Sequence, residues 1–296
     1  MARRLVLIFA SSITLLIASA ARAAYSPSTT SGWFIVVGRV TGFGGAQFRT
    51  DVWLFNPDAQ NNAVVTLIFH PQVANGGGAA APISSAPIIL AARETKYLAD
   101  VLLATVAADN QVGALEWSSN ISVMGGMRSY TVPSGCTGGT FGAFQPGIPT
   151  TESMTPKQSL SDSANALQIF GTSSGDVNYR TQLDVTNTSS VSVPIEVRVI
   201  DPVNATIYGG PQAFTIAPKS LFRVGRILEL ASVAAPLVNG LRVTIAIKEG
   251  TTVASGGILA VASTLDNRSQ DQYAFIGQRQ SGTVVPAEML PIEEVP

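Results

Sequence analysis

The strongest constraint on the fold of this chain is an internal duplication. Three segments recur in the same order: residues 48–56 as 179–187, residues 64–71 as 195–202, and residues 112–115 as 238–241. The first two pairs share an offset of 131 positions and the third has an offset of 126, so small changes in loop length account for the difference. This period is too long for a solenoid, whose repeats span roughly 20–50 residues. Each copy is therefore expected to be a whole domain.

Inside each copy, hydrophobic residues alternate with a period of two. In residues 195–201 (IEVRVID), isoleucine or valine alternates with glutamate and arginine. Residues 241–247 alternate in the same way, and turn-forming clusters such as 75–78 (NGGG) and 209–211 (GGP) separate such runs. This pattern is typical of half-buried antiparallel strands. About seven short strands per copy predict an all-β chain of two tandem β-sandwiches.

One segment in each copy has helical spacing. Residues 98–106 place apolar side chains on one face of a helix, and residues 227–230 occupy the equivalent place in the second copy. We expect each to be a short helical connector. The expected domains are residues 24–145 and 165–280. A Pro/Ser/Thr-rich linker, 146–164, joins them, and an acidic, disordered tail, 281–296, follows.

Residues 1–23 have the pattern of an export signal. Arg3 and Arg4 precede an apolar segment, residues 5–18, and residues 21–23 (ARA) fit the small–x–small cleavage pattern. The apolar segment is shorter than the roughly 20 residues that a membrane-spanning helix needs. We therefore expect cleavage after residue 23 and a secreted or periplasmic product without a membrane span.

Charge and composition exclude several functions. Charged residues make up 12% of the chain, about half of the usual roughly 25%. Removing the three arginines of the signal from 18 basic residues leaves 15 against 19 acidic ones, so no basic surplus favours nucleic acid. One cysteine and one histidine exclude an intrachain disulfide framework and a multi-histidine metal site, and we expect no cofactor. Weakly charged strand edges favour assembly or adhesion, because charges usually block edge-to-edge pairing.

The order of the repeated features suggests a family. Asn187 ends a strand, an alternating strand closed by proline follows at residues 195–202, and a strand–Ala–Pro–Lys step follows at residues 214–219. With its repeated Phe/Tyr-Arg-Thr, the chain resembles uncharacterised tandem immunoglobulin-like β-sandwich modules of exported bacterial proteins. The resemblance covers residues 33–280 and implies an immunoglobulin-like fold for both sandwiches. It implies no functional residue, since such modules serve adhesion, assembly and spacing alike. The first copy departs from the pattern by a Gly/Ala-rich insert, residues 75–81.

Residues 171–175 (GTSSG) match the G-x-S-x-G pattern of serine hydrolases. That mechanism needs a strand-to-helix turn and a histidine base. Here another strand is expected from Tyr179, and the single histidine, His70, belongs to the other copy. We therefore interpret the motif as a hairpin loop and the protein as non-catalytic. A hydrolase with an unrecognised carboxylate pair is the less favoured alternative, because the spatial separation of such a pair is not visible in sequence.

Other titratable residues have ordinary structural interpretations. His70 ends a strand before a proline, and its counterpart in the second copy is Asp201, so we expect a polar turn residue. Asp51 and Asp184 are expected on solvated strand faces.

The candidate interaction residues are Arg49, Arg180 and Cys136. The two arginines occupy the same position of the repeated motif, either for recognition or, as we favour, for bonding a neighbouring carbonyl group. Cys136, in a Gly-rich loop, is either a tolerated thiol or an intermolecular bridge. The loops at residues 75–81 and 131–139 are candidate contact loops.

The expected function is an exported, non-catalytic structural or interaction module at the cell surface, in a matrix or in the periplasm. Its partner would be a protein or a glycan. A carbohydrate-binding module is the alternative, because exposed aromatic rings can stack on sugars. All three tryptophans, Trp33, Trp53 and Trp117, lie in the first copy on expected strands. Trp53 stands between Val52 and Leu54, so it is expected in the core.

Overall fold

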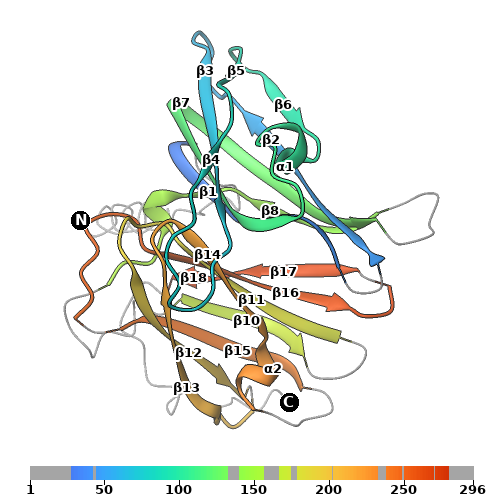
Figure 1. The fold of residues 1–296 in the computed structure, drawn as a ribbon, viewed down its shortest axis with the longest axis vertical. Helices are drawn as coiled ribbons and strands as arrows, with labels where there is room; N and C mark the ends of the chain where they lie inside the picture. Colours follow the sequence, from blue (N-terminus) through green and yellow to red (C-terminus); the bar gives the residue numbers. More distant parts are fainter. Residues whose placement is uncertain are drawn as a thin grey trace, which may run out of the picture.

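A computed structural model describes residues 28–42, 45–132, 140–156, 167–174, 179–201, 203–232, 238–248, 250–269 and 271–279. The expected signal segment, Cys136 and the acidic tail lie outside the described residues. The all-β prediction is confirmed: the chain forms antiparallel sheets with short helices between strands (Figure 1). None of the described helices is long and apolar enough to cross a membrane.

The first copy forms two sheets that share two strands. Its elements are β1 (Thr29–Thr41), β2 (Gln47–Phe55), β3 (Ala63–Pro71), β4 (Ile83–Ser84), β5 (Ile88–Leu90), β6 (Thr95–Leu98), α1 (Val101–Ala104), β7 (Gln111–Val132), β8 (Phe141–Pro146) and β9 (Ile148–Pro149). The 22-residue strand β7 pairs with β1 and β3 through its first half. Its second half pairs with β2 and β8. One sheet therefore contains β3, β7, β1 and β9, with β4 and β5 paired to β3. The other contains β6, β2, β7 and β8, and the end of β1 joins it by pairing with β2.

The second copy repeats this arrangement. Its elements are β10 (Leu167–Ser174), β11 (Tyr179–Asn187), β12 (Val193–Ile200), β13 (Ile207–Ile216), β14 (Ser220–Arg226), α2 (Ile227–Leu230), β15 (Val238–Ile247), β16 (Ile258–Asp266), β17 (Gln272–Ile276) and β18 (Gln278–Arg279). They form the sheets β13–β12–β15–β10–β18 and β14–β11–β16–β17. Here β15 has the pairing position of the first half of β7, and β16 has that of its second half. The strand order thus agrees with the duplicated sequence, and α1 and α2 occupy equivalent places after β6 and β14.

Each copy has its own hydrophobic core, and a third core joins the copies. The first core lies between the sheets of the first copy and includes Phe34 and Leu54. The second lies between the sheets of the second copy. The third brings Trp33 and Ile35 of β1 against Leu221 and other residues of the second copy. Because neighbouring residues of β1 point to opposite faces, this strand is buried on both sides.

Loops strengthen the contact between the copies. The backbone N–H of Val73 donates to the carbonyl of Leu221 at 2.9 Å, and the Asn75 side chain accepts from the backbone N–H of Thr215 at 3.0 Å. The insert expected to contact a partner thus begins with hydrogen bonds to the protein's own second copy.

The first part of the segment expected to be a linker is also built into the fold. Strand β9 pairs with β1, and a 3-10 turn, η2 (Thr150–Glu152), follows it. Met154 is fully buried and exchanges two backbone hydrogen bonds with Ile258, at 2.8 and 2.9 Å. The connection therefore joins both copies through backbone pairing and burial.

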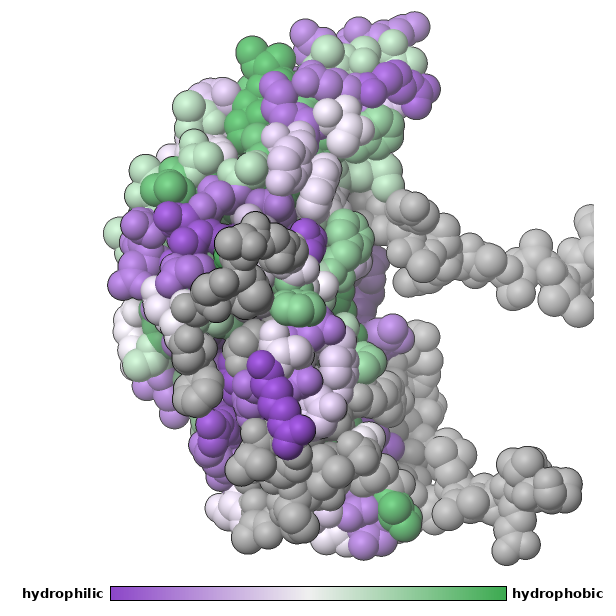
Figure 2. Space-filling view, turned by 90° about the vertical axis from the view of Figure 1, so that its right-hand side faces the viewer, coloured by the Kyte–Doolittle hydropathy of each residue, from purple (hydrophilic) through white to green (hydrophobic). Residues whose placement is uncertain are grey.

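The surface is a mixture of small patches. On the side of the molecule that Figure 2 shows, hydrophobic residues lie in separate groups among hydrophilic ones. Polar side chains on the outward positions of alternating strands produce this surface, in agreement with the low charged fraction.

Candidate functional site

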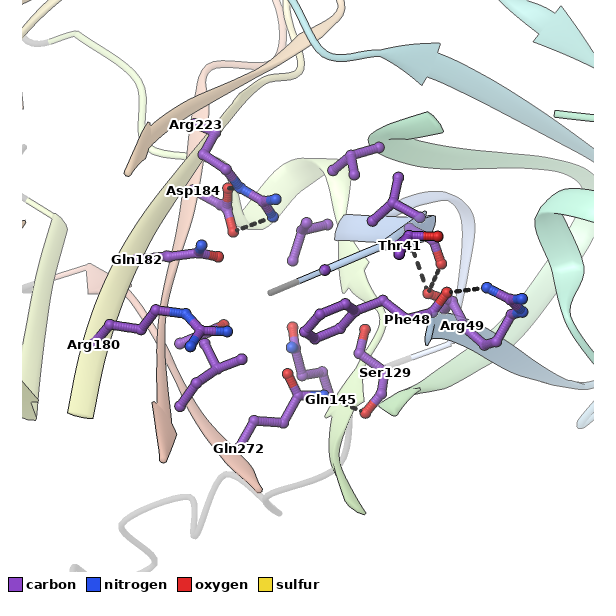
Figure 3. Close-up of a pocket in the computed structure, with 18 residues that line it drawn as sticks. Thr41, Phe48, Arg49, Ser129, Gln145, Arg180, Gln182, Asp184, Arg223 and Gln272 are labelled. Atoms are coloured by element: carbon purple, nitrogen blue, oxygen red, sulfur yellow. Dashed lines mark hydrogen bonds and ion pairs between the residues drawn. The ribbon is translucent and has the colours of Figure 1, made fainter. Parts of the chain in front are cut away.

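A cavity of about 280 Å³ lies at the boundary between the two copies. Strands β1, β2, β7 and β8 of the first copy and β11, β14, β16 and β17 of the second contribute to its wall. Both arginines of the repeated motif, Arg49 and Arg180, belong to this wall (Figure 3). The structure thus brings together two of the three candidate interaction residues.

The two arginines nevertheless differ in orientation. The Arg49 side chain points away from the cavity in Figure 3. It donates to the carbonyl oxygen of Phe48 at 2.8 Å and to the Gln47 side chain at 3.1 Å, and it lies 3.4 Å from a carboxylate oxygen of Asp100. Arg49 therefore contacts groups of its own strand and Asp100.

Arg180 points into the cavity and is 9% exposed (Figure 3). Its guanidinium donates a hydrogen bond to the side-chain oxygen of Asn267. Burial lowers the pKa of Arg180, and the positive charge of nearby Arg226 lowers it further. Arg180 is therefore a largely buried cation whose charged form is disfavoured by desolvation and by Arg226.

Asp184 and Arg223 form an ion pair at the cavity wall. They stand opposite each other on β11 and β14, and two hydrogen bonds of 2.7 and 3.0 Å join the guanidinium to the carboxylate. Burial lowers the pKa of Arg223, but the charge and hydrogen bonds of Asp184 raise it by more, so the net shift is upward.

The expectation of solvated aspartates is wrong for both copies. Asp184 is 1% exposed, because its face of β11 packs against the first copy. Asp51 is 5% exposed and accepts hydrogen bonds from the Tyr97 hydroxyl at 2.7 Å and from the backbone N–H of Asp100 at 2.8 Å.

A second polar cluster lies where the copies meet. His70 is 5% exposed, and its Nε2 lies 2.9 Å from the Glu116 carboxylate. The ammonium of Lys219, from the second copy, donates to the other carboxylate oxygen at 3.0 Å and lies 4.8 Å from the centre of the Trp33 ring. His70 is therefore an interface residue and not the turn residue expected, because the second copy covers the end of β3.

Burial raises the pKa of Glu116, but His70 and Lys219 lower it by more. The hydrogen bond from His70 is the largest of these lowering effects, and the charge and hydrogen bond of Lys219 follow. The net pKa of Glu116 lies below its ordinary value, so the carboxylate is ionised at neutral pH.

Aromatic side chains gather on the outer face of the sheet formed by β6, β2, β7 and β8. Trp53 stands opposite Tyr97 with the ring centres 5.1 Å apart, and the Phe144 ring lies 6.4 Å from the Trp53 ring. Tyr97 is 52% exposed and Phe144 66%. We call Trp53, Tyr97 and Phe144 the aromatic face.

The prediction that Trp53 lies in the core is wrong. Trp53 is only partly buried, because the neighbouring residues Val52 and Leu54 occupy the inward positions of β2. The other two tryptophans, Trp33 and Trp117, are fully buried.

Comparison with known proteins adds no assignment. No protein-family model, curated protein or solved structure matches this chain. Its function is therefore inferred from the geometry above.

The hydrolase-like motif does not form a catalytic site in the described structure. Strand β10 continues to Ser174, so the first four residues of the motif are strand and not the hairpin loop expected; Gly175 lies outside the described residues. His70 lies in the first copy, whereas the motif lies in the second, and His70 contacts Glu116 of its own copy. Among the described residues, no group of three or more histidine, cysteine or acidic side chains is arranged to hold a metal ion.

The sequence interpretation missed four side chains that the structure places at these sites: Tyr97, Phe144, Gln145 and Arg223. Phe144 and Gln145 lie on the short strand β8, whose alternation is too brief to reveal its pairing with β7. The pairing register of β14 with β11 places Arg223 opposite Asp184. Knowledge of that register would have identified Arg223 as the partner of Asp184.

Proposed function

We propose that this protein is an exported, non-catalytic interaction module that binds a protein or a glycan at the cell surface or in the periplasm. The observation that supports this proposal is the aromatic face. Large aromatic side chains supply much of the binding energy in interfaces, and exposed groups of them mark interaction sites. The sheet beneath the rings is paired from β6 to β8, so it presents them on a rigid support.

The export part of the proposal rests on residues 1–23, which lie outside the described residues. The third hydrophobic core supports the interaction part, because it holds the two copies together as one body. A body of this kind orients its aromatic face with little loss of conformational entropy on binding.

We also propose that each copy is immunoglobulin-like in its central strands. In immunoglobulin domains the second and fifth strands share one sheet, and the third and sixth share the other. The pairing of β11 with β14 and of β12 with β15 agrees with this plan. The outer strands differ, because β10 joins β15 and β16 joins β11.

A glycan is the second candidate partner, and the partly exposed Trp53 favours it. The rings of Trp53 and Tyr97 are inclined by 31°, which makes a shallow apolar surface for the C–H face of a sugar. Beside the rings, Arg128 stands opposite both Asp51 on β2 and Phe144 on β8. A cationic group there can donate hydrogen bonds to sugar hydroxyls.

The proposal is tested by pull-down of the chain lacking residues 1–23. The probes are cellulose, chitin, peptidoglycan and cell-envelope protein. We expect Trp53→Ala and Phe144→Ala to weaken binding at least tenfold. Tyr273→Ala, which removes a 39% exposed ring of the second copy, should leave binding unchanged.

The class of probe retained identifies the partner. Retention on a glycan that both aromatic-face variants lose supports the carbohydrate-binding alternative. Retention of envelope protein with the same loss supports a protein partner. Equal binding by all variants, or binding to none of the probes, contradicts the proposal.

A further inference from the structure

The cavity between the copies has the dimensions of a small-molecule site. Its volume of about 280 Å³ is close to the lower end of the range for ligand sites, which is roughly 300–1,000 Å³. Both copies supply its wall, so the cavity exists only while they are docked. A space of this size suits one compact molecule.

A glycine opens the cavity on the side of β1. Val36, Gly38 and Val40 occupy alternating positions of this strand, and all three belong to the wall. Among the described residues, a Cβ atom at Gly38 would have one neighbour within 4 Å, a methyl carbon of Val112 at 3.5 Å. The φ angle of Gly38 is not positive, so the backbone does not require glycine here. A glycine inside a strand often marks the place where a ligand approaches closely.

A buried amide provides an independent observation. Gln145 is 3% exposed and its amide points into the cavity (Figure 3). Its side-chain oxygen, Oε1, has no hydrogen-bond donor among the described residues. A buried acceptor of this kind is normally satisfied, so an O–H or N–H group of a ligand is the natural partner.

The charged groups of the wall do not select an ion. The guanidinium of Arg223 is paired with the carboxylate of Asp184. Arg180 donates to Asn267, and Arg49 points away from the cavity (Figure 3). A charged ligand would lose its hydration on entering this space without gaining an opposite charge, which is costly. The wall therefore favours an uncharged ligand.

The neutral groups of the wall suit a molecule that has both hydroxyl groups and an apolar face. The amide of Gln182 points into the cavity, and Gln272 and Ser263 also belong to the wall (Figure 3). Side-chain amides and hydroxyls both donate and accept hydrogen bonds, as the hydroxyls of a sugar do. The Phe48 ring faces the space and suits the C–H face of a compact ring (Figure 3).

We propose that this cavity binds a neutral polyhydroxylated molecule of the size of a monosaccharide. One hydroxyl of the ligand donates to Gln145, a second bonds the amide of Gln182, and its C–H face packs on Phe48. The site is separate from the aromatic face and does not depend on the partner bound there.

Calorimetric titration of the protein lacking residues 1–23 tests the proposal. The probes are D-glucose, D-galactose, D-xylose and myo-inositol, which are uncharged and rich in hydroxyl groups. We expect at least one of them to bind, and a concentration ten times its Kd should raise the Tm by about 3–5 °C. D-glucuronate and D-galacturonate, the charged counterparts of the two hexoses, should bind at least tenfold more weakly than the probe that binds best.

Two substitutions in the wall should remove the site. Gln145→Leu should weaken binding of the best probe at least tenfold, and Gly38→Leu, which places a side chain in the cavity, should abolish it. Gln278→Leu is the matched control, because it makes the same change at an exposed position outside the wall, and it should alter binding less than twofold. Without ligand, the Tm of Gln145→Leu should be no lower than that of wild type, because the variant loses a buried acceptor that has no partner.

The proposal is overturned if none of the four probes binds at about 10 mM, which is the result expected of a cavity that holds water only. Equal affinity of wild type and Gln145→Leu also overturns it, as does tight binding by Gly38→Leu. Sugars stabilise proteins generally by exclusion from the surface, so equal rises in Tm for wild type and both wall variants would contradict binding in the cavity. A lower ligand-free Tm of Gln145→Leu would show that the amide has a structural role and would contradict the assignment of Oε1 to a ligand.

Discussion

The carboxylate of Glu116 is expected to stabilise the contact between the two copies, and Glu116→Gln tests this. The carboxylate is 13% exposed and accepts hydrogen bonds from His70 at 2.9 Å and from Lys219 at 3.0 Å. A hydrogen bond to a charged group contributes roughly 1.5–3 kcal/mol. Lys219 is 35% exposed and stays over the Trp33 ring, so it keeps part of its solvation when the carboxylate is neutralised. We therefore expect a loss of about 2 kcal/mol, less than the roughly 3–5 kcal/mol for breaking a fully buried pair.

The effect should depend on pH in a defined direction. The pKa of Glu116 is lower in the folded protein than its ordinary value of 4.5. The stabilisation is therefore fully present above that ordinary value and is lost as the pH falls through the folded-state pKa. Wild type should exceed Glu116→Gln in stability at pH 7, and the difference should shrink as the pH falls below 4.5.

Urea unfolding followed by tryptophan fluorescence measures the loss of stability and its dependence on pH. Trp33 reports on this region because it lies beside Lys219. Glu196→Gln is the control, because its partner Arg198 is 45% exposed and surface pairs contribute roughly 0–1 kcal/mol. Equal stability of wild type and Glu116→Gln at pH 7 would refute the reasoning. A difference that does not shrink as the pH is lowered step by step below 4.5 would also refute it.

Four further substitutions have defined outcomes. Asp184→Asn leaves Arg223 facing a neutral amide at a buried position, and urea unfolding should show a loss of roughly 3 kcal/mol. Gly113→Ala places a Cβ atom 2.2 Å from a backbone oxygen, so it should lower the free energy of unfolding by about 2–3 kcal/mol. Gly38→Ala, whose Cβ would have its nearest neighbour at 3.5 Å, should change that energy by less than about 1 kcal/mol. Phe144→Ala removes a 66% exposed ring, so thermal unfolding should show a change within about 0.5 kcal/mol.

The all-β class was predictable because alternation of apolar and polar residues reports directly on strands with one buried face. Alternation does not reveal what covers the other face. Trp33 and Ile35 are outward residues of β1 with respect to the first core, and the second copy buries them. Trp53 stands on a similarly apolar strand, yet no third layer covers it in the described structure.

The candidate site was predictable only in part. The repeated motif singled out Arg49 and Arg180, and both lie at one cavity. Their different orientations depend on Asp100 and Asn267, which lie far along the chain from either motif. Gln145 has no local signal, because its burial comes from pairing and packing that only the assembled sheets create.

The long strand β7 also determines the order in which the first copy can form. Strands β1, β2 and β3 all precede β7 in the chain, and each finds a major partner in it. Arg39 pairs with Gln111, and Thr29 pairs with Val123, so these partners are far apart in the sequence. Such distant pairing slows folding to roughly milliseconds to seconds. Because synthesis starts at the N-terminus, both sheets of the first copy can be completed only after residues 111–132 have been added.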